Sequence, residues 1–330
     1  MRCAVLGAGA WGAALADRLA RNAHDVHLWA YEPDVVDSIN RSHTNRFLAG
    51  VILAPTIVAS TNMAEVVSDA DFVVLVAPSH VTRSVAEAAQ PSLPRDATIV
   101  VASKGIEQHS LARMSEVAEN VFGRTGAVAL SGPTFAAEVV RGQPTAIVAA
   151  CVEQETAELV QQLFHGPAFR VYTQHDVVGV ELGGAVKNVM ALATGIAEGL
   201  ELGFNARAAL ITRGLAEMTR LGIALGADPA TFAGLAGVGD LVLTCTGQLS
   251  RNRSLGVEIG RGKTLDEALA GRETVAEGVI TTRSAKALSE RVGVTMPIVD
   301  AAFSVLFDGQ SPRDAIVDLM NRDPRAERDE

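Results

Sequence analysis

A glycine-rich turn near the start of the chain places the tightest limit on its fold. Gly7, Gly9 and Gly12 form the pattern G-x-G-x-x-G. Apolar runs lie on both sides of this turn, at residues 3–6 and 26–30, and a helical segment precedes the second run. This order is typical of the βαβ unit that binds dinucleotides, because its glycines let backbone N–H groups approach a pyrophosphate at the helix N-terminus. The pattern therefore predicts a dinucleotide site, and a glycine turn without a ligand is the alternative.

The alternation of strands and helices continues through the first half of the chain. Four further apolar runs have the length of buried strands, at residues 72–76, 99–101, 128–130 and 146–150. Segments with helical spacing, such as residues 81–90 and 111–121, lie between them. This alternation predicts a doubly wound parallel sheet, in which a ligand lies beyond the carboxyl ends of the strands.

The second half of the chain has a different pattern. After residues 170–173 the alternation ends, and most of the remaining sequence has helical periodicity. A chain of 330 residues is also long enough for two domains. We therefore expect an α/β protein with an N-terminal Rossmann-type doubly wound sheet at residues 1–179 and an all-helical C-terminal domain at residues 180–330. The Ala- and Gly-rich helical half could also bury a homodimer interface.

Charge and composition argue against several classes of partner. The net charge of −10 argues against nucleic acids and anionic membranes, which need a basic face. The three cysteines form no C-x-x-C pair and no metal-binding spacing, so we expect no metal. The N-terminus lacks a signal segment, and no stretch looks long enough to span a bilayer. We expect a cytoplasmic protein without stable membrane insertion.

Lys187 is the first candidate catalytic residue. It lies in a long apolar helix expected at residues 180–199, beside the small residues Gly183 and Gly184. Each glycine within a helix costs about 1 kcal/mol relative to alanine, so the pair indicates close packing, a ligand or a function. A lysine in a dry cleft can have a shifted pKa and protonate an oxygen. The alternative is an exposed lysine whose stem covers apolar surface.

Three other sites in the sequence carry suitable polar groups. Lys104 follows the apolar run at residues 99–101, so we expect it to face the cofactor cleft or, alternatively, to be a solvated loop lysine. Asp240 ends a glycine-rich turn and could pair with the Lys187 ammonium, or could cap the following helix. Ser250, Arg251 and Asn252 form a turn with free N–H groups and a cation. That turn could bind phosphate or could cap a surface helix.

Two residues after the second predicted strand bear on the choice of cofactor. Tyr31 and Glu32 occupy these positions, and no Arg or Lys appears before Arg41. A carboxylate here could accept a hydrogen bond from a ribose hydroxyl and would repel a 2′-phosphate. We therefore expect NAD(H) to be used at least as well as NADP(H), unless Glu32 points to solvent.

Taken together, the motifs resemble those of bacterial NAD(P)-dependent glycerol-3-phosphate dehydrogenases. The resemblance runs in order from residue 5 to about residue 320 and rests on GAGAWG, SKG at 103–105, SGPTFAAEV at 131–139, ELGGAVKNVMA at 181–191, GVGDL at 237–241, SRN at 250–252 and VAEGV at 275–279. It implies reversible reduction of dihydroxyacetone phosphate to sn-glycerol 3-phosphate, which feeds phospholipid synthesis. One departure is Tyr31, where many relatives carry a basic residue.

The resemblance also implies roles for individual residues. Lys187 would donate and accept the proton, with Lys104 and Asp240 beside it in the catalytic site. The residues expected to line the substrate site are Lys104, Gly132, Thr134, Lys187, Asp240, Ser250, Arg251 and Asn252. The residues expected to touch the dinucleotide are Gly7, Gly9, Ala10, Trp11, Gly12, Tyr31, Lys104, Ala136, Arg251, Val275 and Glu277.

Two other functions fit part of this pattern. A dehydrogenase of the same plan that acts on a β-hydroxy acid or a sugar acid phosphate would also place a lysine on the interdomain helix. A carboxylate substrate, however, would not need the turn at residues 250–252. A non-catalytic redox sensor would explain the glycine turn but not the combination of Lys187, Asp240 and that turn. The phosphate-bearing substrate is therefore favoured.

Overall fold

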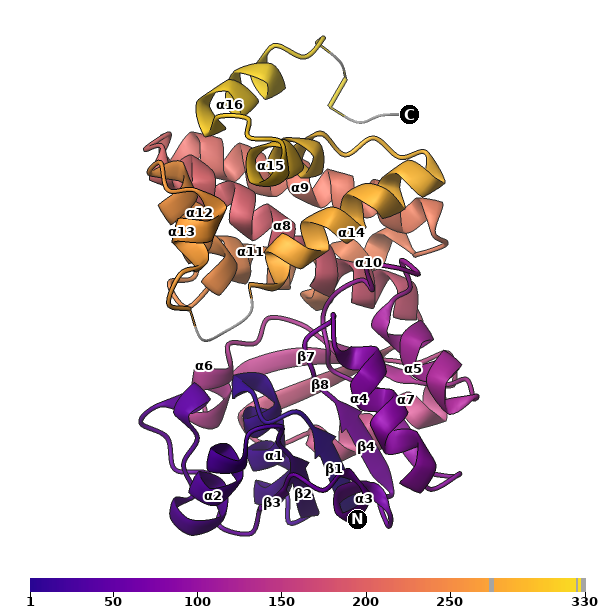
Figure 1. Ribbon diagram of the computed structural model, residues 1–330. Helices are drawn as coiled ribbons and strands as arrows, with labels where there is room; N and C mark the ends of the chain where they lie inside the picture. Colours follow the sequence, from indigo (N-terminus) through magenta and orange to yellow (C-terminus); the bar gives the residue numbers. More distant parts are fainter. Residues whose placement is uncertain (273–275, 325, 328–330) are drawn as a thin grey trace.

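The computed structural model describes residues 1–272, 276–324 and 326–327. It has a sheet part built from the first half of the chain and a helical part stacked on it (Figure 1). The eight-stranded sheet has the order β3-β2-β1-β4-β5-β6-β7-β8. Its strands are β1 Arg2–Leu6, β2 Asp25–Trp29, β3 Val58–Ser60, β4 Phe72–Leu75, β5 Thr98–Val101, β6 Val128–Ser131, β7 Thr145–Ala150 and β8 Phe169–Gln174.

The sheet departs from the predicted one at two points. β7 pairs with β6 in the antiparallel direction, whereas all other neighbouring strands are parallel. The connection between β6 and β7 carries only the short helix α6, Ala136–Val140, so the chain turns back instead of crossing over the sheet. The sequence analysis also missed β3, which has only three residues and no recognisable alternation.

Helices cover both faces of the sheet (Figure 1). Successive residues of one strand enter opposite clusters, as Val73 and Val74 of β4 do, and this pleat explains the unbroken apolar runs. One cluster packs against α1 Ala10–Arg21, α2 Pro33–Ser42, α6 and α7 Gln154–Phe164. The other packs against α3 Met63–Val67, α4 Thr82–Ala89 and α5 Met114–Phe122.

The long helix α8, Val177–Gly199, lies at the centre of the helical part. It begins three residues before the predicted start, because the Asp176 side chain accepts a hydrogen bond from the Gly179 N–H at 2.8 Å and caps it. The elements around it are α9 Gly203–Ala224, α10 Pro229–Phe232, the π-helical turn η3 Leu235–Gly239, α11 Asp240–Thr246, α12 Arg251–Gly260, α13 Leu265–Leu269, α14 Glu277–Val292, α15 Pro297–Phe307 and α16 Pro312–Met320.

Close packing explains the glycines beside Lys187. A Cβ on Gly183 would overlap the carbonyl oxygen of Ala236 in η3, and one on Gly184 would lie 2.5 Å from the Ser131 hydroxyl at the end of β6. The sequence left close packing, a ligand or a function as explanations for these two glycines. Close packing accounts for both. Gly183 therefore lets α8 approach η3, and Gly184 lets it approach the carboxyl edge of the sheet.

The expectation that no stretch is long enough to span a bilayer is wrong. By length and composition, α8 and the segment Pro229–Thr246 both qualify, with mean hydropathies of 1.3 and 1.2. However, 83% of the apolar window in α8 is buried within the protein, so α8 is a core helix. The second segment consists of three short helical elements rather than one continuous α-helix.

Candidate active site

Lys187 is buried on α8, with only 6% of its surface exposed. Its ammonium group donates to a carboxylate oxygen of Asp240 and, at 2.9 Å, to the hydroxyl of Thr244. Both partners belong to α11, where they lie one helical turn apart. The exposed lysine considered as an alternative is therefore not what the structure contains.

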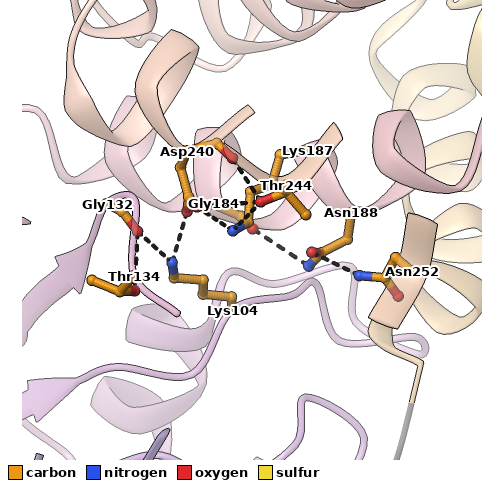
Figure 2. A network of polar contacts seen from close by, with 9 residues as sticks. All are labelled: Lys104, Gly132, Thr134, Gly184, Lys187, Asn188, Asp240, Thr244 and Asn252. Atoms are coloured by element: carbon orange, nitrogen blue, oxygen red, sulfur yellow. Dashed lines mark hydrogen bonds and ion pairs between the residues drawn. The ribbon is translucent and has the colours of Figure 1, made fainter. Parts of the chain in front are cut away.

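Asp240 joins the two parts of the molecule (Figure 2). Its carboxylate is fully buried, and its second oxygen accepts a hydrogen bond from the Lys104 ammonium at 2.7 Å. Lys104 follows β5 in the sheet part and also donates to the Gly132 carbonyl at 2.9 Å. One carboxylate thus holds two ammonium groups, one from each part of the chain, which is the pairing with Lys187 that the sequence suggested.

The burial of this cluster changes the acid–base behaviour of Lys187. Desolvation lowers the pKa of the Lys187 ammonium to about 8. The Asp240 carboxylate opposes this shift, whereas the positive charge of Lys104 adds to it. A lysine with a pKa near neutrality can exchange a proton with a bound oxygen at physiological pH.

The loop after β6 forms one wall beside the two lysines. Gly132 has φ of +152°, and a Cβ there would lie 3.0 Å from the Ile147 Cα, so a side chain would be strained. The Thr134 hydroxyl donates to the Gly132 carbonyl at 3.1 Å, on the side where Lys104 also binds (Figure 2). The structure therefore brings Lys104, Gly132, Thr134, Lys187 and Asp240 together.

The predicted phosphate turn lies at the N-terminus of α12. The Ser250 hydroxyl caps this helix and accepts from the Arg253 N–H at 3.3 Å. Arg251 is exposed, and its guanidinium makes no ion pair with any described residue, although the charge of Glu277 acts on it from a distance. By contrast, Arg253 is held by the Glu198 carboxylate at 2.9 and 2.7 Å. Arg251 is thus the guanidinium of this turn that is free to meet an anion.

Asn252 connects the phosphate turn to the lysine helix. Its side-chain amide N–H donates to the side-chain oxygen Oδ1 of Asn188 at 2.9 Å (Figure 2). Its own side-chain oxygen accepts from the Gly278 backbone N–H at 3.0 Å. Asn188 is the residue after Lys187, so the turn and the lysine cluster are fixed relative to each other. The sequence analysis did not predict these contacts within the protein. Asn252 therefore has a structural role in addition to its predicted role in binding the substrate.

The glycine turn fits a dinucleotide. Gly7 has φ of +127°, and a Cβ on Gly12 would overlap the Gly7 carbonyl oxygen, so both positions require glycine. A Cβ on Gly9 would meet nothing within 4 Å, which leaves open space in front of the α1 N-terminus. The buried indole N–H of Trp11 has no partner among the described residues and can donate to a ligand oxygen. Ala10 is the first residue of α1.

The other predicted dinucleotide contacts are spread over the rim of the sheet. Tyr31 is 80% exposed just after β2, and Ala136 begins α6. Glu277 begins α14 and accepts hydrogen bonds from the Ser79 backbone N–H at 3.1 Å and its hydroxyl at 2.6 Å. Val275 lies outside the described residues.

The sequence analysis assigned no role to two members of the site. Thr244 could have been found from its position four residues after Asp240 in a helix, which places both on one face. Ser79, the partner of Glu277, lies in a loop at the carboxyl edge of the sheet, but its partner is 198 residues away in the chain. No local signal connects the two.

The fold and site together define a class of enzyme. A Rossmann-type sheet with a glycine turn that fits a dinucleotide is joined to a helical part that adds a buried amine, and this combination is that of a nicotinamide-dinucleotide-dependent dehydrogenase.

Comparison with known proteins identifies the family. Residues 2–157 match the family profile described as NAD-dependent glycerol-3-phosphate dehydrogenase N-terminus, and residues 176–317 match the corresponding C-terminus. The chain is 52% identical to glycerol-3-phosphate dehydrogenase [NAD(P)+] of Syntrophotalea carbinolica, over 100% of both chains. It is 53% identical to that of Geobacter metallireducens, over 98% of each chain. The chain belongs to the NAD(P)+-dependent glycerol-3-phosphate dehydrogenases.

A solved structure supports the same assignment. The crystal structure of glycerol-3-phosphate dehydrogenase from Coxiella burnetii superimposes with a TM-score of 0.94 at 38% identity, over 97% of this chain and 98% of that one. The chain is therefore an oxidoreductase with NAD(P)+ as coenzyme. The predicted family and fold class are confirmed.

Proposed function

We propose that the enzyme reduces dihydroxyacetone phosphate reversibly to sn-glycerol 3-phosphate, with Lys187 as the proton donor and acceptor. The observation that carries this proposal is the buried Lys187–Asp240–Lys104 cluster between the two parts of the molecule. When bound, the nicotinamide supplies hydride to the ketone carbon. The Lys187 ammonium stabilises the negative charge that develops on the carbonyl oxygen and gives it a proton. In the reverse direction, the neutral amine accepts the proton.

The residues around Lys187 supply positive potential, hold the ammonium groups in position and line the substrate site. Lys104 adds positive potential beside the reacting oxygen and contacts the substrate and the nicotinamide. Asp240 keeps both ammonium groups in place, and Gly132 and Thr134 form the adjoining wall. A preorganised group of this kind needs little rearrangement during the reaction, which is where electrostatic catalysis gains its advantage.

The substrate phosphate binds at the N-terminus of α12. Ser250, Arg251 and Asn252 supply a helix N-terminus, a free guanidinium and a side-chain amide. Because the phosphate is remote from the reacting carbon, its binding energy orients the ketone against the amine. This requirement for phosphate separates the proposed substrate from a β-hydroxy acid.

The dinucleotide binds along the edge of the sheet that carries the glycine turn. Gly7, Gly9, Ala10, Trp11 and Gly12 face its pyrophosphate. Its other contacts are Tyr31, Lys104, Ala136, Arg251, Val275 and Glu277. NAD(H) is used at least as well as NADP(H), because Glu32 lies at the N-cap position of α2, three residues after β2, and its carboxylate makes no capping hydrogen bond, so it can accept from a ribose hydroxyl. The product feeds phospholipid synthesis in the cytoplasm, and the helical part offers a surface for a homodimer.

The experiment that tests this function follows NADH absorbance with dihydroxyacetone phosphate as the substrate. We expect the wild-type protein to oxidise NADH, and Lys187→Ala to lower kcat by about a hundredfold or more while the Kd for NADH stays nearly unchanged. Lys263→Ala, an exposed lysine paired with Glu258 at 3.1 Å, is the matched control and should keep full activity. An unchanged kcat in Lys187→Ala, or turnover of a β-hydroxy acid instead, would contradict the proposal.

A further inference from the structure

A short turn after α2 is anchored to the dinucleotide-binding turn. The side-chain amide of Asn45 donates to the backbone carbonyl of Ala8 at 2.8 Å, inside the G-x-G-x-x-G sequence. The other end of the same side chain accepts from the Phe47 N–H at 2.9 Å and so caps the 3₁₀ turn η1, Arg46–Leu48. Asn45 is only 2% exposed, so this anchor is shielded from water. The position of Arg46 is therefore fixed relative to the pyrophosphate turn.

Arg46 brings a positive charge to the end of β2. Its guanidinium pairs with the Asp34 carboxylate and lies 3.8 Å from a carboxylate oxygen of Glu32. Both carboxylates lie at the start of α2, directly after the strand whose end receives the adenosine ribose in this fold. The Arg46 side chain is 45% exposed, so a ligand can reach it. The first basic residue in the sequence after β2 is Arg41, which pairs with Asp37, whereas Arg46 is the one that pairs with the two carboxylates at the start of α2.

We propose that Arg46 is the residue that admits NADP(H), and that its pairing with Glu32 and Asp34 sets the balance between the two coenzymes. When NADP(H) binds, its 2′-phosphate replaces the two carboxylates as the partner of the Arg46 guanidinium and forms a charge-assisted contact with it. With NAD(H), Arg46 stays paired, and Glu32 remains available to accept from the ribose hydroxyls. The inference rests on the coenzyme site of the proposed function, and it explains how a site with two carboxylates accommodates a phosphate at all.

The test measures binding rather than turnover. Kd values for NADH and NADPH are determined by nucleotide fluorescence, and those for 5′-AMP and adenosine 2′,5′-bisphosphate by calorimetry. We expect Arg46→Gln to raise the Kd values for NADPH and adenosine 2′,5′-bisphosphate about tenfold or more, because a charge-assisted contact is lost. The Kd values for NADH and 5′-AMP should change by less than about threefold. Asp34→Asn, which releases the guanidinium, should strengthen NADPH binding.

Two further variants make the result decisive. Arg46→Lys keeps the charge and should retain most of the NADPH affinity. Arg41→Gln removes an exposed arginine of α2 whose partner is Asp37 at 3.8 Å, and it should change neither Kd. Equal effects of Arg46→Gln on NADH and NADPH, or no effect on either, would overturn the inference. Because no substrate is present, failure to turn over dihydroxyacetone phosphate counts against the proposed reaction alone.

Discussion

The charge on Lys187 determines how the rate of each direction of the reaction depends on pH. Burial lowers the pKa of this amine to about 8, and the reduction needs the protonated form whereas the oxidation needs the neutral form. We therefore expect kcat/KM for ketone reduction to fall as the pH rises through about 8, and kcat/KM for alcohol oxidation to rise over the same range. Stopped-flow measurements of NADH formation and loss give both profiles. Two profiles that move in the same direction would contradict this role of Lys187.

Arg251 acts on substrate binding rather than on the chemical step. Its guanidinium is free among the described residues, so the phosphate is its partner in both the ground state and the transition state. We expect Arg251→Ala to raise KM for dihydroxyacetone phosphate about tenfold or more, with kcat changed by less than about threefold. Arg313→Ala, an exposed arginine on α16, should leave both constants unchanged. A large loss of kcat at constant KM would be inconsistent with phosphate binding.

At the scale of the elements, glycines let α8 and α12 approach each other unusually closely. Gly195 and Gly199 of α8 face Gly256 and Gly260 of α12. A Cβ on Gly195 would overlap the Arg253 carbonyl oxygen, and one on Gly256 would overlap that of Leu192. Because α12 carries the phosphate turn and α8 carries Lys187, this packing sets the spacing between the two.

Gly195→Ala tests the packing of α8 against α12. The added methyl group meets backbone, which cannot rotate away, so we expect the free energy of unfolding to fall by about 2 kcal/mol. Urea denaturation followed by circular dichroism measures the change. Gly239→Ala is the matched control, since a Cβ there would lie 3.6 Å or more from its neighbours. Its stability should equal or exceed that of the wild type, and equal losses in both variants would refute the packing argument.

The elements also show what a sequence can and cannot predict. The start of α12 was predicted correctly, because the cap Ser250 is a local signal. The antiparallel direction of β7 was not, since the pairing of strands depends on how the chain returns to the sheet. The same holds for the site. Lys104 and Asp240 could each be singled out by their loops, but their contact joins residues 136 positions apart.

On the scale of the whole molecule, buried polar contacts tie the helical part to the sheet part. Glu181 of α8 accepts from the Ser115 N–H at 2.8 Å and pairs with Arg113 at 3.0 Å, both at the start of α5. Burial raises the pKa of Glu181, and these hydrogen bonds and the nearby guanidinium oppose the shift. Glu277 and Ser79 form a second tie of this kind, which positions α14 over the loop after β4. The relative position of the two parts is therefore specified by buried polar groups as well as by apolar contacts.

Asp240 forms the tie that also belongs to the catalytic cluster, so its removal tests both roles at once. In Asp240→Asn, the two ammonium groups lose the negative charge between them, which removes the contribution that raises the pKa of Lys187. With a lower pKa, the protonated form of the Lys187 amine is lost at lower pH. The profile for ketone reduction should therefore move to lower pH, and kcat near neutrality should fall by about tenfold or more.

The matched control for this variant is Asp300→Asn. Asp300 of α15 pairs with Lys286 of α14 at 3.0 Å, and neither residue belongs to the site. Removing the Asp300 charge should therefore leave the pH profile unchanged. Thermal unfolding of both variants separates a loss of stability from a change in the amine. If Asp240→Asn keeps the wild-type profile, the Asp240 carboxylate holds the two parts together without governing the proton on Lys187. If the profile moves as expected, a single buried carboxylate couples the assembly of the two parts to the acid–base chemistry between them.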